Sequence, residues 1–279
     1  MMTYQSRHVL RDEKLPQVRR DLLARIIAKL KLHKAIEGIF LGGSIACDNE
    51  DLFSDIDLRI VVSEDQFDEY VRNKQRLASE FDEVLFFEEM NPLASYTIAH
   101  YANFIKVDLF IYTFLRLQPS IWLKGIKIVF DPSGRLQDLL NSSEKLTYQV
   151  SKEEAEQWRG KVFAYIHEVY RRVLREEYYY ALTSINYLRS FIVNGWNMES
   201  DRHSNAAWDW SKIEGARSQL EPWQLSLLSS WMCGRDQEEI MKTLYSMIPE
   251  IRRLHGVLCE KTGLEQNQEK FDRILNLVL

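Results

Sequence analysis

The segment DIDLRIVV, at residues 55–62, constrains the fold of this chain more than any other stretch. Side chains of a β-strand alternate between the two faces of the sheet, so Asp55 and Asp57 point one way while Ile56 and Leu58 point into the core. The two carboxylates then lie about 7 Å apart and repel each other unless a cation sits between them. The sequence therefore predicts a strand with one buried face and one cation-binding face.

A second apolar run brings a third carboxylate into a similar environment. Asp108 lies in IKVDLFIYT, residues 105–113, with apolar residues on both sides. Burying an unpaired charge is costly, so this carboxylate needs a partner. If the two strands pair, three acids meet, and their oxygens suit Mg²⁺ together with the phosphate oxygens of a substrate. Such a set is typical of a metal site for phosphoryl or nucleotidyl transfer.

A glycine pair precedes the acids. GIFLGGS, residues 38–44, reads as a short apolar strand that ends in Gly42 and Gly43. Glycine lets backbone N–H groups approach a phosphate closely. Ser44 is predicted to cap a short following helix and to hydrogen-bond phosphate oxygens. The spacer that follows, residues 45–53, is acidic, so it repels a bare triphosphate and attracts a cationic acceptor.

The rest of the first half is predicted to surround these elements with helices and strands. Asp65 is the expected N-cap of the second helix, and the arginines of KLPQVRR, residues 14–20, are expected on an ordinary helix surface. The expected helices cover residues 15–35 and 65–81, and the further strands cover residues 82–89, 95–102 and 126–131.

After about residue 141 the pattern becomes helical. A long helix is predicted over residues 151–193, with Val162, Ile166, Val169 and Val173 on one stripe. Further helices are expected at residues 220–232, 236–262 and 265–279, and a loop at residues 194–212. The chain is therefore an α+β protein. A mixed β-sheet with flanking helices occupies residues 1–145, and a helical bundle occupies residues 146–279.

Composition narrows the class of function. The net charge of −5 over 279 residues argues against a general nucleic-acid coat. Three widely spaced cysteines with no CxxC pair argue against a zinc site and against a disulfide framework. No apolar run is long enough to span a bilayer, and the first 20 residues lack the apolar core of a secretory signal. We expect a cytoplasmic protein without a membrane partner.

Three motifs carry a resemblance to a known superfamily. Gly43-Ser44, Asp55-Ile56-Asp57-Leu58 and Val107-Asp108-Leu109 resemble the nucleotidyltransferase superfamily of DNA polymerase beta. Within it, SDIDLRIVV followed by a helical half resembles the aminoglycoside 6-adenylyltransferases, with lincosamide nucleotidyltransferases as relatives. The resemblance implies that residues 1–145 bind metal and nucleotide, and that residues 146–279 bind the acceptor. It also implies transfer of AMP from ATP, with Mg²⁺, to a hydroxyl of a small molecule, with release of pyrophosphate.

The resemblance also implies roles for individual residues. Asp55 and Asp57 match the metal ligands, and Asp108 matches the third acid, a ligand or general base. Gly43 and Ser44 match the triphosphate-binding turn. These five positions form the expected catalytic and cofactor-binding set of the first half.

The helical half contributes two further candidates. REEYYYAL, residues 175–182, resembles a helix pattern of the same group, which implies that Arg175 binds phosphate and that Glu177 accepts the proton of the acceptor hydroxyl. Glu168 and Arg171 share a helix face with Arg175, and a solvated salt-bridged surface is the favoured interpretation of that pair. Two alternatives remain: a catalytically degenerate binding module, or a transferase that uses a protein or tRNA acceptor.

A tryptophan-rich loop is open to two interpretations. Trp208 and Trp210 flank Asp209, a combination able to hold a cationic amino sugar. Anchoring of the loop to the helical core is the more common use of such tryptophans. The acceptor itself is expected to be small and cationic.

Overall fold

The computed structural model describes residues 6–88, 91–204 and 208–279 of the chain. The chain divides into two compact units, Met1–Thr147 and Tyr148–Leu279. Each unit has a hydrophobic core of its own.

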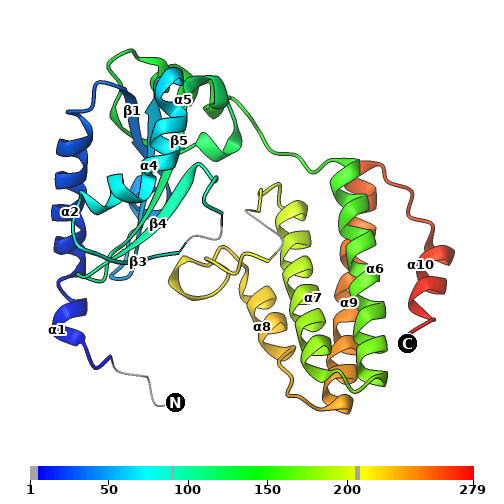
Figure 1. Cartoon of the computed structure of the whole chain (residues 1–279). Coiled ribbons are helices and arrows are strands. Elements are labelled where there is room, and N and C mark those ends of the chain that lie inside the picture. The colour runs from blue at the N-terminus through cyan, green and yellow to red at the C-terminus, as the bar shows by residue number, and fades with distance from the viewer. Residues whose placement is uncertain (1–5, 89–90, 205–207) are drawn as a thin grey trace. The chain divides into compact units, whose positions relative to one another are not determined.

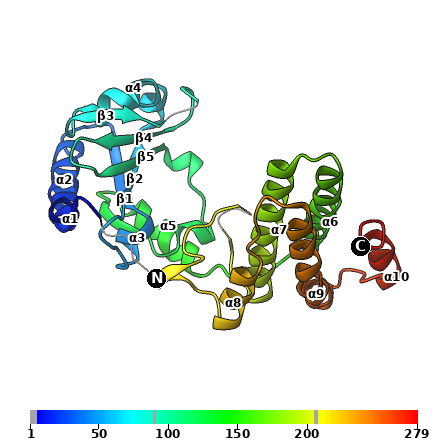
Figure 2. The same cartoon turned by 90° about the horizontal axis from the view of Figure 1, so that it is seen from below.

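A six-stranded mixed sheet forms the centre of the first unit (Figures 1 and 2). The strand order is β3-β4-β5-β2-β1-β6. Strands β2 and β5 pair in parallel, whereas the other neighbouring pairs are antiparallel. The predicted mixed sheet is therefore confirmed. The strands are β1 (Ile36–Leu41), β2 (Ile56–Val62), β3 (Val84–Phe87), β4 (Tyr96–Tyr101), β5 (Lys106–Tyr112) and β6 (Lys127–Phe130).

The two faces of this sheet are covered differently. Helices α2 (Leu15–Leu30) and α4 (Phe67–Ser79) pack against the larger apolar face, where the even-numbered residues of β2 are fully buried. Helix α5 (Arg135–Glu144) contributes Leu136 to a smaller core on the opposite face. The odd-numbered residues of β2, which include Asp57, lie on this second face, and Asp55 directly precedes the strand. The shorter elements are α1 (Val9–Asp12), α3 (Gly43–Ala46), η1 (Glu64–Gln66), η2 (Phe114–Arg116) and η3 (Ile121–Leu123).

The second unit is helical. The predicted apolar stripe of Val162, Ile166, Val169 and Val173 lies on α6 (Lys152–Leu174) and is fully buried. Helix α6 packs with α7 (Tyr178–Glu199) and α9 (Gln237–Thr262). Ser151 begins α6 with a reciprocal capping box, in which its hydroxyl accepts the Glu154 N–H and the Glu154 carboxylate accepts the Ser151 N–H. In the described part of the chain no helix is long and apolar enough to cross a membrane. The elements are α6 (Lys152–Leu174), α7 (Tyr178–Glu199), η4 (Gly215–Arg217), α8 (Pro222–Ser230), α9 (Gln237–Thr262) and α10 (Gln268–Leu275).

Several predicted boundaries are wrong. The single helix expected over residues 151–193 is two helices, because Glu176 turns the chain with φ +59°. Helix α7 also continues to Glu199, into the expected loop. Asp65 lies in η1, and the N-cap of α4 is Gln66. Helix α5 has no counterpart in the prediction. Residue 89 of the third predicted strand and residues 205–207 of the predicted loop lie outside the described residues.

Candidate active site

The strand pairing places the three acids of the first unit on one face of the sheet. Asp57 of β2 is the register partner of Asp108 on the parallel strand β5. Asp55 precedes Asp57 by two positions and therefore shares its face. All three carboxylates lie on the side of the sheet opposite α2 and α4.

Lys106 joins the acids as a cation. Its Nζ lies 2.8 Å from Oδ2 of Asp55 and 3.3 Å from each carboxylate oxygen of Asp108. Burial lowers the pKa of Lys106, but the hydrogen bond to Asp55 and the charges of both acids outweigh burial and raise it. Sequence reasoning missed this residue, although its position two residues before Asp108 on the same strand places it on the same face.

Asp108 is the most enclosed of the three carboxylates. Burial raises its pKa, the neighbouring Lys106 charge opposes this, and the charges of Asp55 and Asp57 raise it further. Its Oδ1 is buried and accepts no hydrogen bond from the described residues. A carboxylate in this environment favours either a proton or an additional cation.

The donor set fits Mg²⁺ by its chemistry, because all three side chains offer carboxylate oxygens, and Oδ1 of Asp108 makes no hydrogen bond with the described residues although Nζ of Lys106 lies 3.3 Å away. Within residues 6–88, 91–204 and 208–279, no three His, Cys, Asp or Glu side chains are arranged closely enough to hold an ion. Lys106 instead lies between Asp55 and Asp108. The ammonium group thus supplies the positive charge that balances these two acids.

Each of the two glycines after β1 makes room for one side chain of β2. Gly43 has φ +60°, and a Cβ there would lie 1.7 Å from Oδ2 of Asp57. A Cβ on Gly42 would lie 2.1 Å from Nη1 of Arg59. The Gly42 N–H also donates to the Asp57 carbonyl at 3.0 Å. The predicted capping role of Ser44 is wrong, because Ser44 lies inside α3 and Gly42 is the N-cap.

Arg59 is a further cation on the same face. It follows Asp57 by two positions, and its Nη1 donates to the Asp57 carbonyl at 3.2 Å. Its guanidinium carbon lies 5.1 Å from the ring centroid of Phe110, which holds it over the sheet. A guanidinium held beside the glycine turn suits phosphate oxygens. Arg59 is a candidate site residue that the motifs did not predict.

The decisive comparison is with protein-family models. A model described as streptomycin adenylyltransferase matches residues 17–278. The chain belongs to the streptomycin adenylyltransferase family. It is therefore an adenylyltransferase, with ATP as co-substrate and a small-molecule acceptor. This membership confirms the resemblance drawn from the motifs and speaks against a non-catalytic module.

Two solved structures resemble the chain at low sequence identity. The aminoglycoside 6-adenyltransferase from Bacillus subtilis is 12% identical, with 93% of this chain and 97% of that chain covered and a TM-score of 0.43. A nucleotidyltransferase-like protein from Exiguobacterium sibiricum 255-15 is 14% identical, with 88% and 77% covered and a TM-score of 0.42. No curated protein matches the chain.

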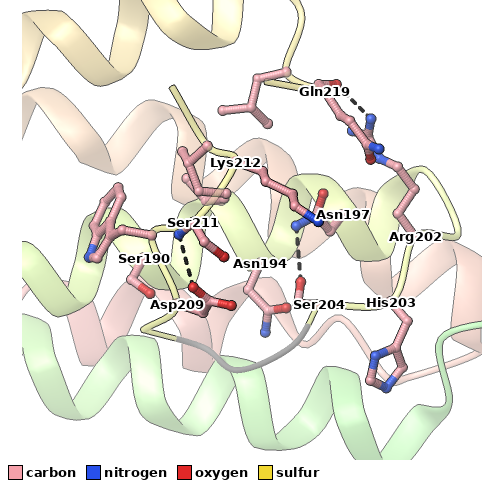
Figure 3. A pocket seen from close by; sticks show the side chains of 14 residues that line it. Ser190, Asn194, Asn197, Arg202, His203, Ser204, Asp209, Ser211, Lys212 and Gln219 are labelled. Carbon is pink, nitrogen blue, oxygen red and sulfur yellow. Dashed lines mark hydrogen bonds between the residues drawn. The ribbon is translucent and has the colours of Figure 1, made fainter. Parts of the chain in front are cut away.

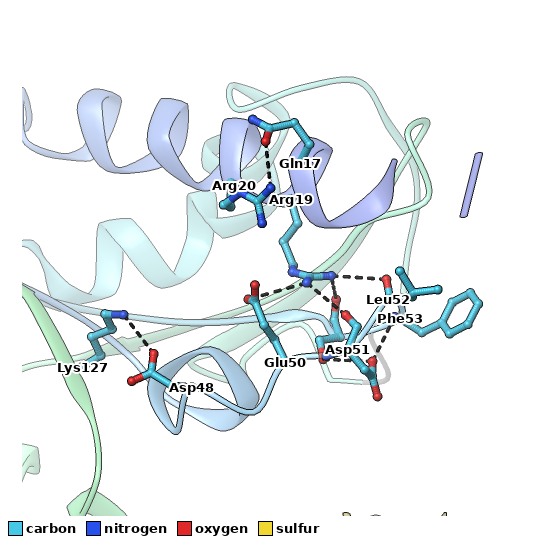
Figure 4. Close-up of polar contacts among 10 residues, drawn as sticks. Gln17, Arg19, Arg20, Asp48, Glu50, Asp51, Leu52, Phe53 and Lys127 are labelled. Atoms are coloured by element: carbon cyan, nitrogen blue, oxygen red, sulfur yellow. Dashed lines mark hydrogen bonds and ion pairs between the residues drawn. The ribbon is translucent and has the colours of Figure 1, made fainter. Parts of the chain in front are cut away.

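In this adenylyltransferase the acidic spacer is folded around a buried arginine of α2 (Figure 4). Arg19 is 1% exposed and donates to the carbonyl oxygens of Asp51 at 3.0 Å, Leu52 at 3.3 Å and Ser54 at 3.1 Å. Glu50 lies 3.6 Å from the same guanidinium. The prediction that Arg19 belongs to an ordinary helix surface is wrong. The guanidinium fixes the main chain that leads directly into Asp55.

The carboxylates of the spacer have partners inside the first unit. The Asp51 side chain accepts the Phe53 N–H at 2.9 Å, and Asp48 lies 3.4 Å from Nζ of Lys127. With Glu50 directed at Arg19, the spacer offers less negative charge to an acceptor than its composition suggests.

Arg175 and Glu177 lie in the second unit, at the turn between α6 and α7. Arg175 is the C-cap of α6, and Glu177 is the N-cap of α7. The assumption that both belong to a continuous helix is wrong. Oε2 of Glu177 lies 2.5 Å from Nη1 of Arg172, which also pairs with Glu168 at 2.8 Å. Glu168 further pairs with Arg171 at 3.0 Å, as in a salt-bridged helix surface.

Two adjoining cavities of about 170 and 430 Å³ lie in the second unit, lined by residues of its helices and by described residues of the segment that follows α7. Figure 3 shows the smaller one. Polar contacts hold the described part of this segment: Asn197 donates to the Ser204 hydroxyl at 2.9 Å, and the Ser211 N–H donates to Asp209 at 2.9 Å. Trp210 packs against the helical core, as expected of an anchor, whereas Trp208 is 62% exposed. The cavities are large enough for a sugar ring, and Trp208 lines the larger one.

Proposed function

We propose that this adenylyltransferase transfers AMP from Mg²⁺-bound ATP to a hydroxyl of a small aminoglycoside-like antibiotic, with release of pyrophosphate. The observation that supports this most is the set of three carboxylates on adjacent parallel strands beside a glycine turn that leaves room for Asp57. The family supplies the nucleotide and the general class of acceptor.

Different residues of the first unit bind the triphosphate and the metal ion. The backbone at Gly42 and Gly43, with Ser44 and the guanidinium of Arg59, binds the triphosphate. Asp55, Asp57 and Asp108 would hold Mg²⁺, which, when bound, neutralises negative charge on the phosphates. Lys106 balances the acids when nucleotide is absent. In the second unit, Arg175 is the candidate for a further phosphate contact.

The chemical step requires positioning and one proton transfer. The acceptor hydroxyl oxygen forms a bond to the α-phosphorus while the bond from this phosphorus to the bridging oxygen of pyrophosphate breaks. The hydroxyl proton passes to a carboxylate. Asp108 is the favoured acceptor because its carboxylate lies on the same face of the sheet as Asp55 and Asp57. Glu177 is the alternative.

Replacement of one acid tests the proposal. Asp57→Asn should abolish pyrophosphate release while leaving the thermal unfolding midpoint unchanged or slightly higher, because a carboxylate repulsion is relieved. Asp68→Asn, at an exposed position of α4, is the matched control and should retain activity. Products of labelled ATP, Mg²⁺ and a panel of aminoglycosides and lincosamides are followed by mass spectrometry. Normal turnover by Asp57→Asn would show that the assigned chemistry is wrong.

A further inference from the structure

A cavity of about 190 Å³ lies inside the second unit, where α6, α9, α10 and the turn before α10 meet. None of the residues assigned above to the transfer reaction lines it. Its apolar part is formed by Phe163 and Phe271, whose ring centroids are 5.2 Å apart. Benzene binds in a protein cavity of about 150 Å³, so this cavity has room for one aromatic ring.

A glycine in the middle of α6 forms part of the cavity wall. Gly160 lies well inside the helix Lys152–Leu174, where glycine is less favourable than alanine. Beyond its own helix, no described atom lies within 4 Å of the position that a Cβ would take, so packing does not require glycine here. A larger side chain at this position would instead occupy the cavity. Gly160 therefore keeps space open where the helix itself would be more stable with another residue.

A buried histidine supplies the cavity with a polar group. His255 is 1% exposed and lines the cavity, and its ring stacks on Phe271. Burial, helped by the charge of Arg159, lowers the pKa of His255 to about 4, so the ring is neutral at pH 7. Its Nε2 lies 3.5 Å from Nη1 of Arg159.

This contact determines which ring nitrogen carries the proton. A guanidinium offers only N–H donors, so Nε2 of His255 presents its lone pair to Arg159 and the proton lies on Nδ1. Among the residues that the structure describes, Nδ1 has no hydrogen-bond partner. A buried donor without an acceptor is costly, and a ligand that accepts its hydrogen bond would remove this cost.

The charges around the cavity are balanced. Two acidic and two basic side chains line it, those of Glu156, Glu265, Arg159 and Lys270. Arg159 pairs with Glu156 and donates to the Glu265 carbonyl at 2.8 Å, so protein groups already compensate its charge. A charged ligand would lose its hydration without finding an excess of opposite charge. The lining therefore favours an uncharged ligand.

We propose that this cavity binds a small uncharged aromatic ring compound that bears a hydrogen-bond acceptor, with its ring against Phe163 and Phe271 and its acceptor atom on Nδ1–H of His255. The site is a second ligand site of the enzyme, and it does not depend on the proposed transfer reaction. A compound bound there stabilises the folded helical unit by mass action.

Side-chain ¹⁵N NMR of the histidines in the full chain tests this site. Nicotinamide and benzamide are the probes, and benzoate is the comparison, because it has the shape of benzamide but carries a negative charge. Both amides should shift the Nδ1 signal of His255, which is assigned with His255→Gln. The signals of His33, whose Nδ1 lies 2.9 Å from the Tyr70 hydroxyl in the first unit, should stay unchanged.

A variant that fills the cavity provides the second test. Gly160→Leu should weaken the binding of benzamide at least tenfold, because the new side chain takes the place of the ring, while circular dichroism shows an intact helical fold. Ala164→Leu is the matched control, because Ala164 is exposed on the same helix and does not line the cavity. It should keep the affinity of wild type.

Three results would overturn the proposal. If neither amide shifts the His255 signal, the cavity is not a site for such rings. Equal benzamide affinities in Gly160→Leu and wild type would show that the ring binds elsewhere. Tighter binding of benzoate than of benzamide would show that the assignment to uncharged compounds is wrong.

Discussion

At the scale of single residues, the site depends on side chains that share one face of β2 and β5. The sequence predicted the three acids, because strand alternation determines which side chains share a face. The same rule would have found Lys106 and Arg59, each two positions from an acid on its own strand. It could not have shown that Lys106 bridges Asp55 and Asp108, because that contact requires the parallel pairing of two strands far apart in the sequence.

Gly43→Ala tests whether the space at Gly43 positions the Asp57 carboxylate, apart from any effect on the free energy of unfolding. The new methyl group would displace the Asp57 carboxylate, and a misplacement of this kind costs on the order of 100-fold in kcat. The positive φ adds about 1–2 kcal/mol of destabilisation. Gly134→Ala is the control, because it has φ +75° but no atom within 4 Å of the new Cβ. Adenylyl transfer and urea unfolding are measured on both. Equal kcat values for the two variants would contradict the proposed role of the Gly43 contact.

Lys106→Met should make the first unit depend on divalent cations. Without them, Asp55 and Asp108 lose their shared ammonium, and the part-exposed site should lose about 1 kcal/mol of stability. Mg²⁺ should then raise the thermal unfolding midpoint more in the variant than in wild type, because it binds only the folded arrangement of acids. Lys127→Met, which breaks an exposed pair with Asp48, should show no such difference. Identical Mg²⁺ responses in the two variants would argue against an ion site at these acids.

At the scale of elements, the two-part pattern of strands then helices was predictable, whereas the turn at residues 175–177 was not. The apolar period continues from α6 into α7, and neither glycine nor proline marks the break. Glu176 adopts a positive φ that its residue type does not favour. The sequence pattern of α2 placed Arg19 on the surface, because the partners of Arg19 are main-chain carbonyls more than 30 residues away in the sequence.

Arg19→Met should loosen the spacer before Asp55. Loss of charged hydrogen bonds to three carbonyl oxygens is expected to cost roughly 3 kcal/mol in the free energy of unfolding. Chymotrypsin should also cut sooner at Leu52 and Phe53, which are already 42% and 64% exposed. Arg20→Met, whose guanidinium contacts only Gln17 among the described interactions, is the control on the same helix. Indistinguishable cleavage rates would show that Arg19 does not hold this segment.

At the scale of the whole molecule, each unit has its own core, and the core of the helical unit contains His255, whose Nδ1 has no hydrogen-bond partner among the residues that the structure describes. His255 is 1% exposed, and its ring stacks on Phe271 with centroids 4.2 Å apart. Burial, helped by the charge of Arg159, lowers its pKa from 6.5 to about 4. The folded state therefore excludes a proton that the unfolded chain accepts.

The stability of the helical unit should consequently depend on pH. The pKa of His255 is lowered on folding, so the neutral ring makes its full contribution to the free energy of unfolding above pH 6.5. This contribution is lost as the pH falls toward 4. The expected loss is on the order of 2 kcal/mol. His255→Leu should flatten this part of the profile, while His8→Leu, at an exposed position, should not. Denaturant unfolding followed by circular dichroism between pH 4 and 7 measures the effect. An unchanged slope in His255→Leu would contradict it.

The attachment of the spacer to α2 has a consequence for inhibition. Arg19 reaches the loop from the face of the sheet that packs against α2 and α4 in the main core. The three acids lie on the opposite face. A compound that binds between α2 and this loop would separate the loop from Arg19 just before Asp55. It would inactivate the enzyme although it resembles neither substrate. Raising the concentration of ATP or of the acceptor would not restore activity.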